Sequence, residues 1–114
     1  VRLARIYEEQ HRTRPALEER RRAVAANPED PTLLFELGEA LARAGELVEA
    51  QVVLRQAVEA NPRSHRALYV LGFVAQQVAS REEARTVYTR FLELAPSRFN
   101  DQKLEARRRL EALN

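Results

Sequence analysis

The side chains that could carry out acid–base or metal chemistry are few in this sequence and are poorly placed for it. The two histidines, His11 and His65, each stand alone near a predicted helix end, without a second ligand at a metal-binding spacing. The paired carboxylates are sequence neighbours, which point to different faces of a helix; they are Glu8-Glu9, Glu18-Glu19 and Glu82-Glu83. The chain has no cysteine and no glycine-rich phosphate loop. We therefore predict that it is not an enzyme and that it binds no metal and no cofactor.

Two runs of arginine, at 20–22 and 107–109, have the chemistry to contact phosphates. Both runs lie among glutamates at helical spacing, such as Glu18 with Arg22, which favours ion pairs on a solvated helix face. The formal net charge is only +2, whereas proteins that read nucleic acids usually carry a larger, clustered excess. The sequence therefore argues against a nucleic-acid partner.

The segments that must position these side chains share a sequence pattern that repeats at a fixed interval. Three prolines, Pro28, Pro62 and Pro96, are evenly spaced along the chain, and each closes a similar stretch such as Ala-Val-Glu-Ala-Asn-Pro. A period of this length is typical of stacked repeats and not of one globular core. Ala, Leu, Glu and Arg dominate the composition, and long stretches lack Gly and Pro, which favours helix. We therefore predict an all-α repeat protein that works through a long surface.

Residues 31–64 show the repeat most clearly. One face of the first helix is apolar at i, i+3, i+4 and i+7, which are Leu34, Leu37, Gly38 and Leu41. Asp30 before Pro31 is a helix start signal, and Gly45 allows a tight turn. The second helix carries its own apolar face, which consists of Ala50, Val53, Leu54 and Ala57. We expect Asn61 to end this helix in a left-handed cap, with Pro62 after it.

Residues 65–98 repeat the pattern. The first apolar face is Leu68, Leu71, Gly72 and Ala75, and the second includes Ala84, Tyr88 and Phe91. Ser80 followed by Glu83 predicts a capping box at the start of the second helix, in which each side chain binds a backbone N–H.

This pattern resembles the tetratricopeptide repeat family, a helix–turn–helix unit of about 34 residues with Leu and Gly or Ala at positions 7 and 8, Ala at 20 and 27 and Pro at 32. The family also has a large residue at positions 4 and 11 and an aromatic residue or Leu at 24. Residues 31–64 fit every position, with Leu34, Leu41 and Leu54 at these three. Residues 65–98 depart at Ala75, which is small where the family has bulk, and at Phe91, which is large where the family has Ala. These two departures either offset each other in volume or open the packing towards the next helix. The resemblance implies a right-handed α-solenoid.

The two ends fit the pattern less well. Residues 1–30 resemble a clipped first copy, in which Arg20 replaces the expected aromatic or Leu. Residues 99–114 fit only after a shift of one residue, which places Ala106, Leu110 and Leu113 on one stripe. We therefore predict one domain of seven helices. It divides into a degenerate unit 1–30, full units 31–64 and 65–98, and a C-terminal capping helix 99–114, for which a truncated fourth repeat is the alternative.

In this family the first helix of each repeat lines a concave groove, and the resemblance carries that role onto this chain. The predicted peptide-binding groove consists of Phe35, Glu36, Glu39, Arg43, Arg66, Tyr69, Val70, Phe73, Gln76 and Gln77. Its aromatic and aliphatic members form a candidate apolar patch, and apolar anchors flanked by charge are usual in protein interfaces. An aromatic residue at the position of Phe35 and Tyr69 also often packs against the neighbouring helix, which is the structural alternative.

Some members of the family hold the C-terminal carboxylate of a chaperone in a clamp of basic and asparagine residues. The corresponding places here are Val1, Arg5, Glu36, Arg66 and Val70, of which only Arg66 fits. The resemblance therefore does not extend to a chaperone-tail site.

The resemblance implies a protein-interaction scaffold or adaptor, whose groove binds a peptide or helix of a partner protein. The alternative is structural, namely a segment of a longer array or a self-associating module whose ends stack. No apolar run approaches the ~18 residues that span a membrane, so we predict a soluble protein, either cytoplasmic or periplasmic. Lys103 is the only lysine and Met is absent, which suggests a bacterial or archaeal source and an excised or processed chain.

Overall fold

The structure is a computed structural model, and it describes residues 16–113. A helical segment spans 16–26. It is followed by α2 (Pro31–Arg43), α3 (Leu47–Ala60), α4 (His65–Gln77), α5 (Arg81–Leu94), the 3₁₀ turn η1 (Ser97–Phe99) and α6 (Asn100–Leu113). No strand occurs in this part of the chain. The predicted first helix of the degenerate unit, with His11 and Glu8-Glu9, lies outside the described residues.

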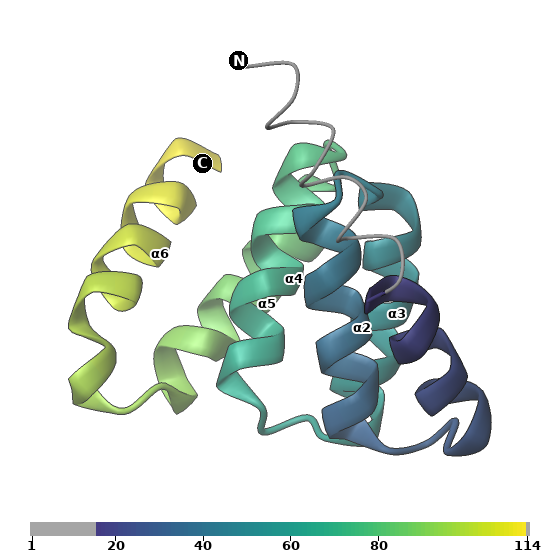
Figure 1. The fold of residues 1–114 in the computed structure, drawn as a ribbon. Coiled ribbons are helices and arrows are strands. Elements are labelled where there is room, and N and C mark those ends of the chain that lie inside the picture. The colour runs from purple at the N-terminus through teal and green to yellow at the C-terminus, as the bar shows by residue number, and fades with distance from the viewer. Residues whose placement is uncertain (1–15, 114) are drawn as a thin grey trace, which may run out of the picture.

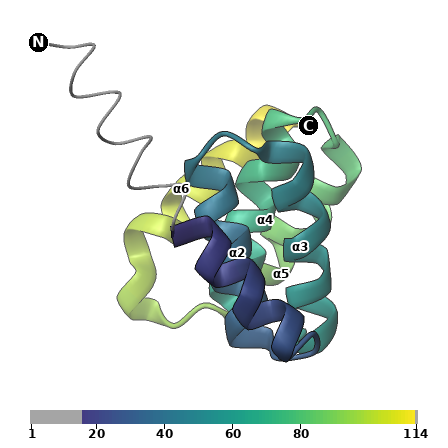
Figure 2. The same ribbon diagram turned by 45° about the vertical axis from the view of Figure 1, so that its right-hand side comes forward.

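The helices stack as antiparallel pairs, which confirms the predicted all-α, right-handed solenoid. Helix α2 packs against α3, α3 against α4, and α4 against α5 (Figures 1 and 2). Helix α6 packs mainly against α5 at the C-terminal end of the array (Figure 1). Ala106 and Leu113 of α6 are buried and Leu110 is half-buried, so the predicted stripe with its one-residue shift is confirmed.

The first helix of each full repeat starts on a side-chain cap. The Asp30 carboxylate accepts hydrogen bonds from the backbone N–H groups of Thr32 (2.9 Å) and Leu33 (3.2 Å), as predicted. Ser64 Oγ accepts a bond from the N–H of Ala67 at the start of α4 (3.3 Å). These caps satisfy N–H groups that have no partner within the helix, and they fix where the helices begin.

Two predicted caps of the second helices are wrong. Asn61 ends α3 with φ −143° and not in the left-handed region, and its side-chain oxygen accepts from the N–H of Arg63 instead. The Ser80 side chain makes no cap bond at the start of α5, and so the capping box with Glu83 does not form. Ser80 and Glu83 instead accept hydrogen bonds from Gln51 of the preceding repeat, which occupies the oxygen atoms that a capping box would use.

The turn inside each repeat has the same backbone shape but a different residue. Gly45 has φ +82° between α2 and α3, and the N–H of Glu46 donates to the carbonyl of Leu41 (2.9 Å). Ala79 takes the equivalent place between α4 and α5 with φ +62°. An alanine in this left-handed region costs about 1–2 kcal/mol, because its Cβ crowds the backbone. The stacking of α4 on α5 therefore imposes this turn on a residue that disfavours it.

Phe91 and Ala75 do not offset each other directly. Both are buried, but the Phe91 ring packs against His65 and Tyr69 near the start of α4. Ala75 stands near the other end of α4, at a distance from His65 of about 15 Å along the helix axis. Phe91 and Ala75 therefore pack at opposite ends of the same helix pair.

Candidate functional site

Two adjoining hollows lie along α2 and α4. The first has a volume of about 290 Å³ and is lined by Phe35, Glu39, His65, Arg66, Tyr69, Val70, Phe91, Phe99 and Gln102. The second has a volume of about 260 Å³ and is lined by Glu39, Ala42, Arg43, Tyr69, Val70 and Phe73. Because the hollows share Glu39, Tyr69 and Val70, they form one continuous depression, which we call the groove.

Most of the predicted site residues meet in the groove. Those that line it are Phe35, Glu39, Arg43, Arg66, Tyr69, Val70 and Phe73. The other three predicted residues do not line either hollow. The Glu36 carboxylate lies 3.5 Å from the Arg20 guanidinium, Gln76 Oε1 accepts a hydrogen bond from Arg109 (2.9 Å), and Gln77 is exposed on α4.

Tyr69 belongs to a cluster of rings beneath the first hollow. Its ring centroid lies 5.0 Å from that of Phe91 and 6.3 Å from that of Tyr88, and both of these partners are buried in α5. Pairs at these separations stabilise a core beyond the area that they bury. Tyr69 is therefore half in the core, as the structural alternative held, whereas Phe73 keeps 38% of its surface exposed.

The sequence prediction missed four residues of the first hollow, namely His65, Phe91, Phe99 and Gln102. Phe99 lies in η1, and its ring centroid is 4.8 Å from that of His65. Phe91 had a sequence signal, because it is bulky where the repeat has Ala. Phe99 and Gln102 had none, since they depend on the path of η1 between α5 and α6.

Two buried polar groups lie beside the ring cluster without a hydrogen-bond partner among the described residues. They are Nε2 of His65 and the hydroxyl of Tyr88. Burial lowers the pKa of His65 below its usual 6.5, and the nearby Arg66 and Arg98 lower it further. Burial raises the pKa of Tyr88 to about 12. Both side chains are therefore neutral at pH 7, and His65 adds no charge to the first hollow that it lines.

Arg109 of α6 contacts Phe73, one of the residues that line the groove. Its guanidinium lies 5.3 Å from the centroid of the Phe73 ring, pairs with Glu105 at 3.0 Å and donates to Gln76. Cation–π contacts of this kind contribute about 0.5–1 kcal/mol when exposed. Arg109 belongs to the arginine run 107–109, and these contacts are the ion pairing and packing expected of a helix face.

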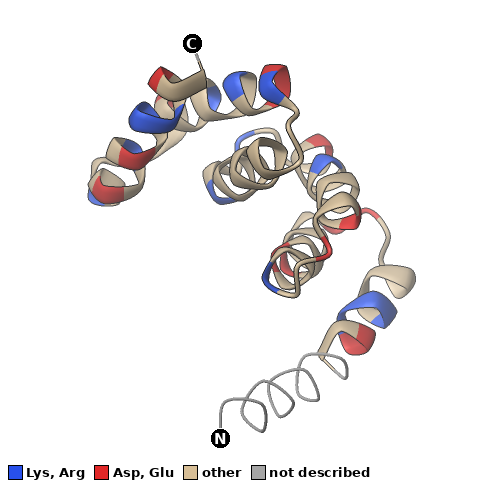
Figure 3. Ribbon diagram, turned by 90° about the horizontal axis from the view of Figure 1, so that it is seen from above, with Lys and Arg blue, Asp and Glu red and all other residues tan. Residues whose placement is uncertain are grey.

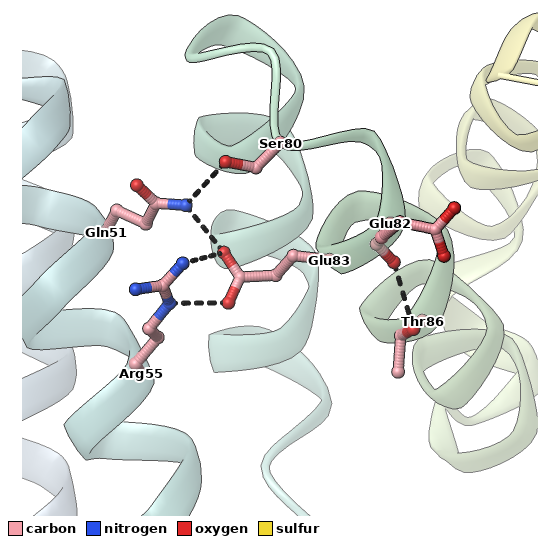
Figure 4. Close-up of polar contacts among 6 residues, drawn as sticks. All are labelled: Gln51, Arg55, Ser80, Glu82, Glu83 and Thr86. Atoms are coloured by element: carbon pink, nitrogen blue, oxygen red, sulfur yellow. Dashed lines mark hydrogen bonds and ion pairs between the residues drawn. The ribbon is translucent and has the colours of Figure 1, made fainter.

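A polar cluster joins α3 to α5 on another side of the stack (Figure 4). Arg55 binds both carboxylate oxygens of Glu83, with Nε 2.5 Å from Oε2 and Nη2 3.0 Å from Oε1. Gln51 Nε2 donates to Glu83 Oε1 (2.6 Å) and to Ser80 Oγ (3.0 Å). This two-pronged pairing fixes how one repeat sits on the next.

The same pair recurs one period earlier. Arg21 and Glu49 occupy the places in the repeat that Arg55 and Glu83 occupy in the next one. They too form a two-pronged ion pair, of which one bond is Nη2 to Oε1 at 3.0 Å. The repeated Arg and Glu are a sequence signal that the prediction did not use. They hold successive repeats together and lie outside the groove.

The described helices carry both signs of charge. The segment 16–26 and α6 each carry both acidic and basic residues (Figure 3). Within 16–113, no cluster of His, Asp and Glu has the arrangement of a metal site. No helix in this range is long and apolar enough to cross a membrane.

Comparison with known proteins places this geometry in a family. The sequence profile described as tetratricopeptide repeat matches residues 7–72. No curated protein sequence shows significant similarity to the chain.

Solved structures share the fold over nearly the whole chain. One is the first tetratricopeptide repeat domain of Spaghetti (RPAP3) bound to the HSP90 peptide SRMEEVD. It has a TM-score of 0.78 and 26% identity, and the match covers 96% of this chain and 82% of that one. Another is the Yersinia enterocolitica type III secretion chaperone SycD with a peptide of the translocator YopD. It has a TM-score of 0.81 and 16% identity, with 97% and 86% covered.

A third is the Sgt2 domain from Aspergillus fumigatus, with a TM-score of 0.74, 17% identity and 94% and 74% covered. Because the SycD and Sgt2 structures are only 16% and 17% identical to this chain, their likeness concerns the fold alone.

Proposed function

Because the chain belongs to the tetratricopeptide repeat family, we propose that it is a protein-interaction scaffold or adaptor whose groove binds a segment of a partner protein. The observation that carries this proposal is the groove itself. Two hollows with largely apolar linings lie side by side, and Phe73 lines the second of them with 38% of its surface exposed. Exposed aromatic side chains beside charged residues are the usual anchors of an interface.

The related structures agree with this proposal. The Spaghetti domain is described with an HSP90 peptide and SycD with a translocator peptide. The fold that they share with this chain is therefore one that holds peptides.

The charges of this groove differ from those of a clamp for an acidic chaperone tail. Glu39 lines both hollows, and Glu36 lies one turn before it on α2. Only Glu39 of these two lines the groove, since Glu36 pairs with Arg20 outside both hollows. The Glu39 carboxylate disfavours an acidic ligand residue beside it, because like charges at an interface repel. We therefore propose a partner other than an acidic C-terminal tail.

A pull-down from the source organism tests the proposal with the variant Phe73→Ala. Truncation of a central anchor typically costs about 2 kcal/mol or more of binding, which is about 30-fold in affinity. Phe73 is partly exposed, so the fold should survive, as circular dichroism would verify. Leu104→Ala is the matched control, because Leu104 is a 48% exposed apolar residue on α6 that lines neither hollow.

A partner that is lost with Phe73→Ala and kept with Leu104→Ala supports the groove as the binding surface. A partner retained by both variants contradicts it.

Self-association is a second candidate function, and it is supported by a separate observation. Val48 and Val52 lie one turn apart on α3, and they are 72% and 48% exposed. Light scattering over a concentration series tests this candidate. If α3 mediates assembly, the mass rises with concentration and Val48→Lys together with Val52→Lys abolishes the rise. A constant monomer mass contradicts it.

A further inference from the structure

The spacing of the two hollows limits what the groove can hold. Along α2 the lining moves from Phe35 and Glu39 to Glu39, Ala42 and Arg43. The centres of the hollows are therefore about one helical turn apart, or roughly 5–6 Å. In an extended chain, residues i and i+2 point to the same side and lie about 6.6 Å apart. Two alternate side chains of an extended segment therefore match the two hollows.

The first hollow matches the size of a single side chain. Phe35 of α2 and Gln102 of α6 line the same space, whose volume is about 290 Å³. A helix with its side chains is about 10–12 Å across. A hollow of this volume accommodates one large side chain and is too small to enclose a helical turn.

Glu39 lines both hollows. Its negative charge favours a positively charged ligand residue between the two side chains that fill the hollows. The only ion pair that the Glu39 carboxylate makes within the described residues is with Arg43, at 3.7 Å, and the Arg43 side chain is 78% exposed. Such an exposed i,i+4 pair is weak. The neighbouring charges are engaged elsewhere, since Glu36 pairs with Arg20 and Arg109 pairs with Glu105. Arg66 lines the first hollow only.

We propose that the ligand of the groove is an extended segment of a partner protein, in which two large apolar residues flank a lysine or arginine. The apolar side chains fill the two hollows. The basic side chain lays its aliphatic stem along the rim and brings its charge to Glu39. This inference rests on the proposed function and specifies the chemistry of the partner.

Selection from a random dodecapeptide display library tests the inference, using the whole chain as bait. Three baits run in parallel: wild type, Glu39→Lys and the control Glu59→Lys. Glu59 is exposed on α3 and lines neither hollow. We expect wild type and Glu59→Lys to enrich an apolar–basic–apolar triplet. Glu39→Lys should keep the two apolar positions and exchange the basic residue for Asp or Glu.

Affinity measurements then quantify the charge. For one selected peptide, replacing its basic residue by Glu should weaken binding to wild type by about three- to tenfold, as measured by fluorescence anisotropy. Glu39→Lys should restore the binding of that Glu peptide.

Three results would overturn the inference: apolar residues enriched at a helical spacing of three or four, a middle residue that ignores the charge at position 39, or no enriched peptide. None of these results decides the proposed function. That depends on whether a partner is lost with Phe73→Ala, so a groove-dependent partner with a different motif would sustain the function and refute this inference.

Discussion

The two full repeats, 31–64 and 65–98, have the same arrangement of helices but differ in the side chains of their cores. In the first, Gly38 faces the aliphatic side chain of Leu54, and Ala57 is the small buried residue of α3. In the second, Gly72 faces the ring of Tyr88, and Phe91 stands where Ala57 stands. The first repeat is therefore packed with aliphatic groups and the second with rings.

This difference shows where a repeat protein acquires a site. Leu54 and Ala57 fit the repeat pattern and serve only the core. Phe91 departs from the pattern, and it lines the first hollow together with Phe99. The irregular Phe91 therefore adds to a groove that regular positions of α2 and α4, such as Phe35 and Tyr69, also line.

The largest effect should come from Phe91→Ala. The variant removes a ring that is 1% exposed and packs against both Tyr69 and His65. Deleting a buried phenylalanine costs about 3–5 kcal/mol, because a cavity remains. Urea unfolding followed by circular dichroism measures this loss. If the stability fell by less than about 1 kcal/mol, the rings of the second repeat would not form a packed core.

The glycines that face α3 and α5 sharpen the comparison. A Cβ on Gly38 would lie 2.6 Å from Cγ and Cδ2 of Leu54, and a Cβ on Gly72 would lie 2.7 Å from Cε1 of Tyr88. Both partners are fully buried, but the short aliphatic Leu54 side chain has more staggered conformations to move into than the planar Tyr88 ring. Overpacking costs about 1–3 kcal/mol, so we expect Gly72→Ala near the upper end and Gly38→Ala near the lower end.

The same unfolding measurement compares the two variants directly. Equal losses of stability would mean that the Leu54 side chain and the Tyr88 ring accommodate the added methyl group equally well. A larger loss for Gly38→Ala would reverse the distinction between the two repeats.

The apolar pattern predicted the fold well, because periodicity is set by residues that every repeat must bury. Leu34, Leu37 and Leu41 were read from spacing alone, and all three are buried. The turn at Gly45 was equally clear, since glycine favours its positive φ. The matching turn at Ala79 has no such signal, because packing and not local preference sets its φ of +62°. The local residue type therefore predicts the turn at Gly45 but not the turn at Ala79.

Side-chain partners between repeats were harder to predict. Ser80 and Glu83 have the local sequence of a capping box, but Gln51 and Arg55 from the preceding repeat bind them instead. A partner that lies a whole repeat away in the sequence cannot be seen in a local motif. The same limit hid Phe99 and Gln102 from the predicted groove, whose positions assumed a regular linker before α6.

The two junctions between repeats provide a smaller test. Glu83 is 22% exposed and also binds the buried Gln51, whereas Glu49 is 41% exposed and binds Arg21. Glu83→Ala leaves the amide of Gln51 with Ser80 alone, which should cost about 1–2 kcal/mol. Glu49→Ala should cost about 0.5 kcal/mol or less. Urea unfolding of both variants at two salt concentrations checks this order, and a greater loss for Glu49→Ala would contradict it.

The smallest effect should be a pH dependence that only the second repeat has, because its first helix begins at His65 where the first repeat has Pro31. The pKa of His65 is lowered by burial in the folded state, so the unfolded chain binds more protons in the window just below pH 6.5. The contribution of neutral His65 is therefore complete above that window and is lost as the pH falls through it.

Comparing the free energy of unfolding at pH 7.5 and 5.5 for wild type and His65→Gln isolates this contribution. Wild type should lose more stability on acidification than the variant, whose side chain stays neutral at both values. Equal losses would mean that His65 is as well solvated in the folded protein as in the unfolded chain.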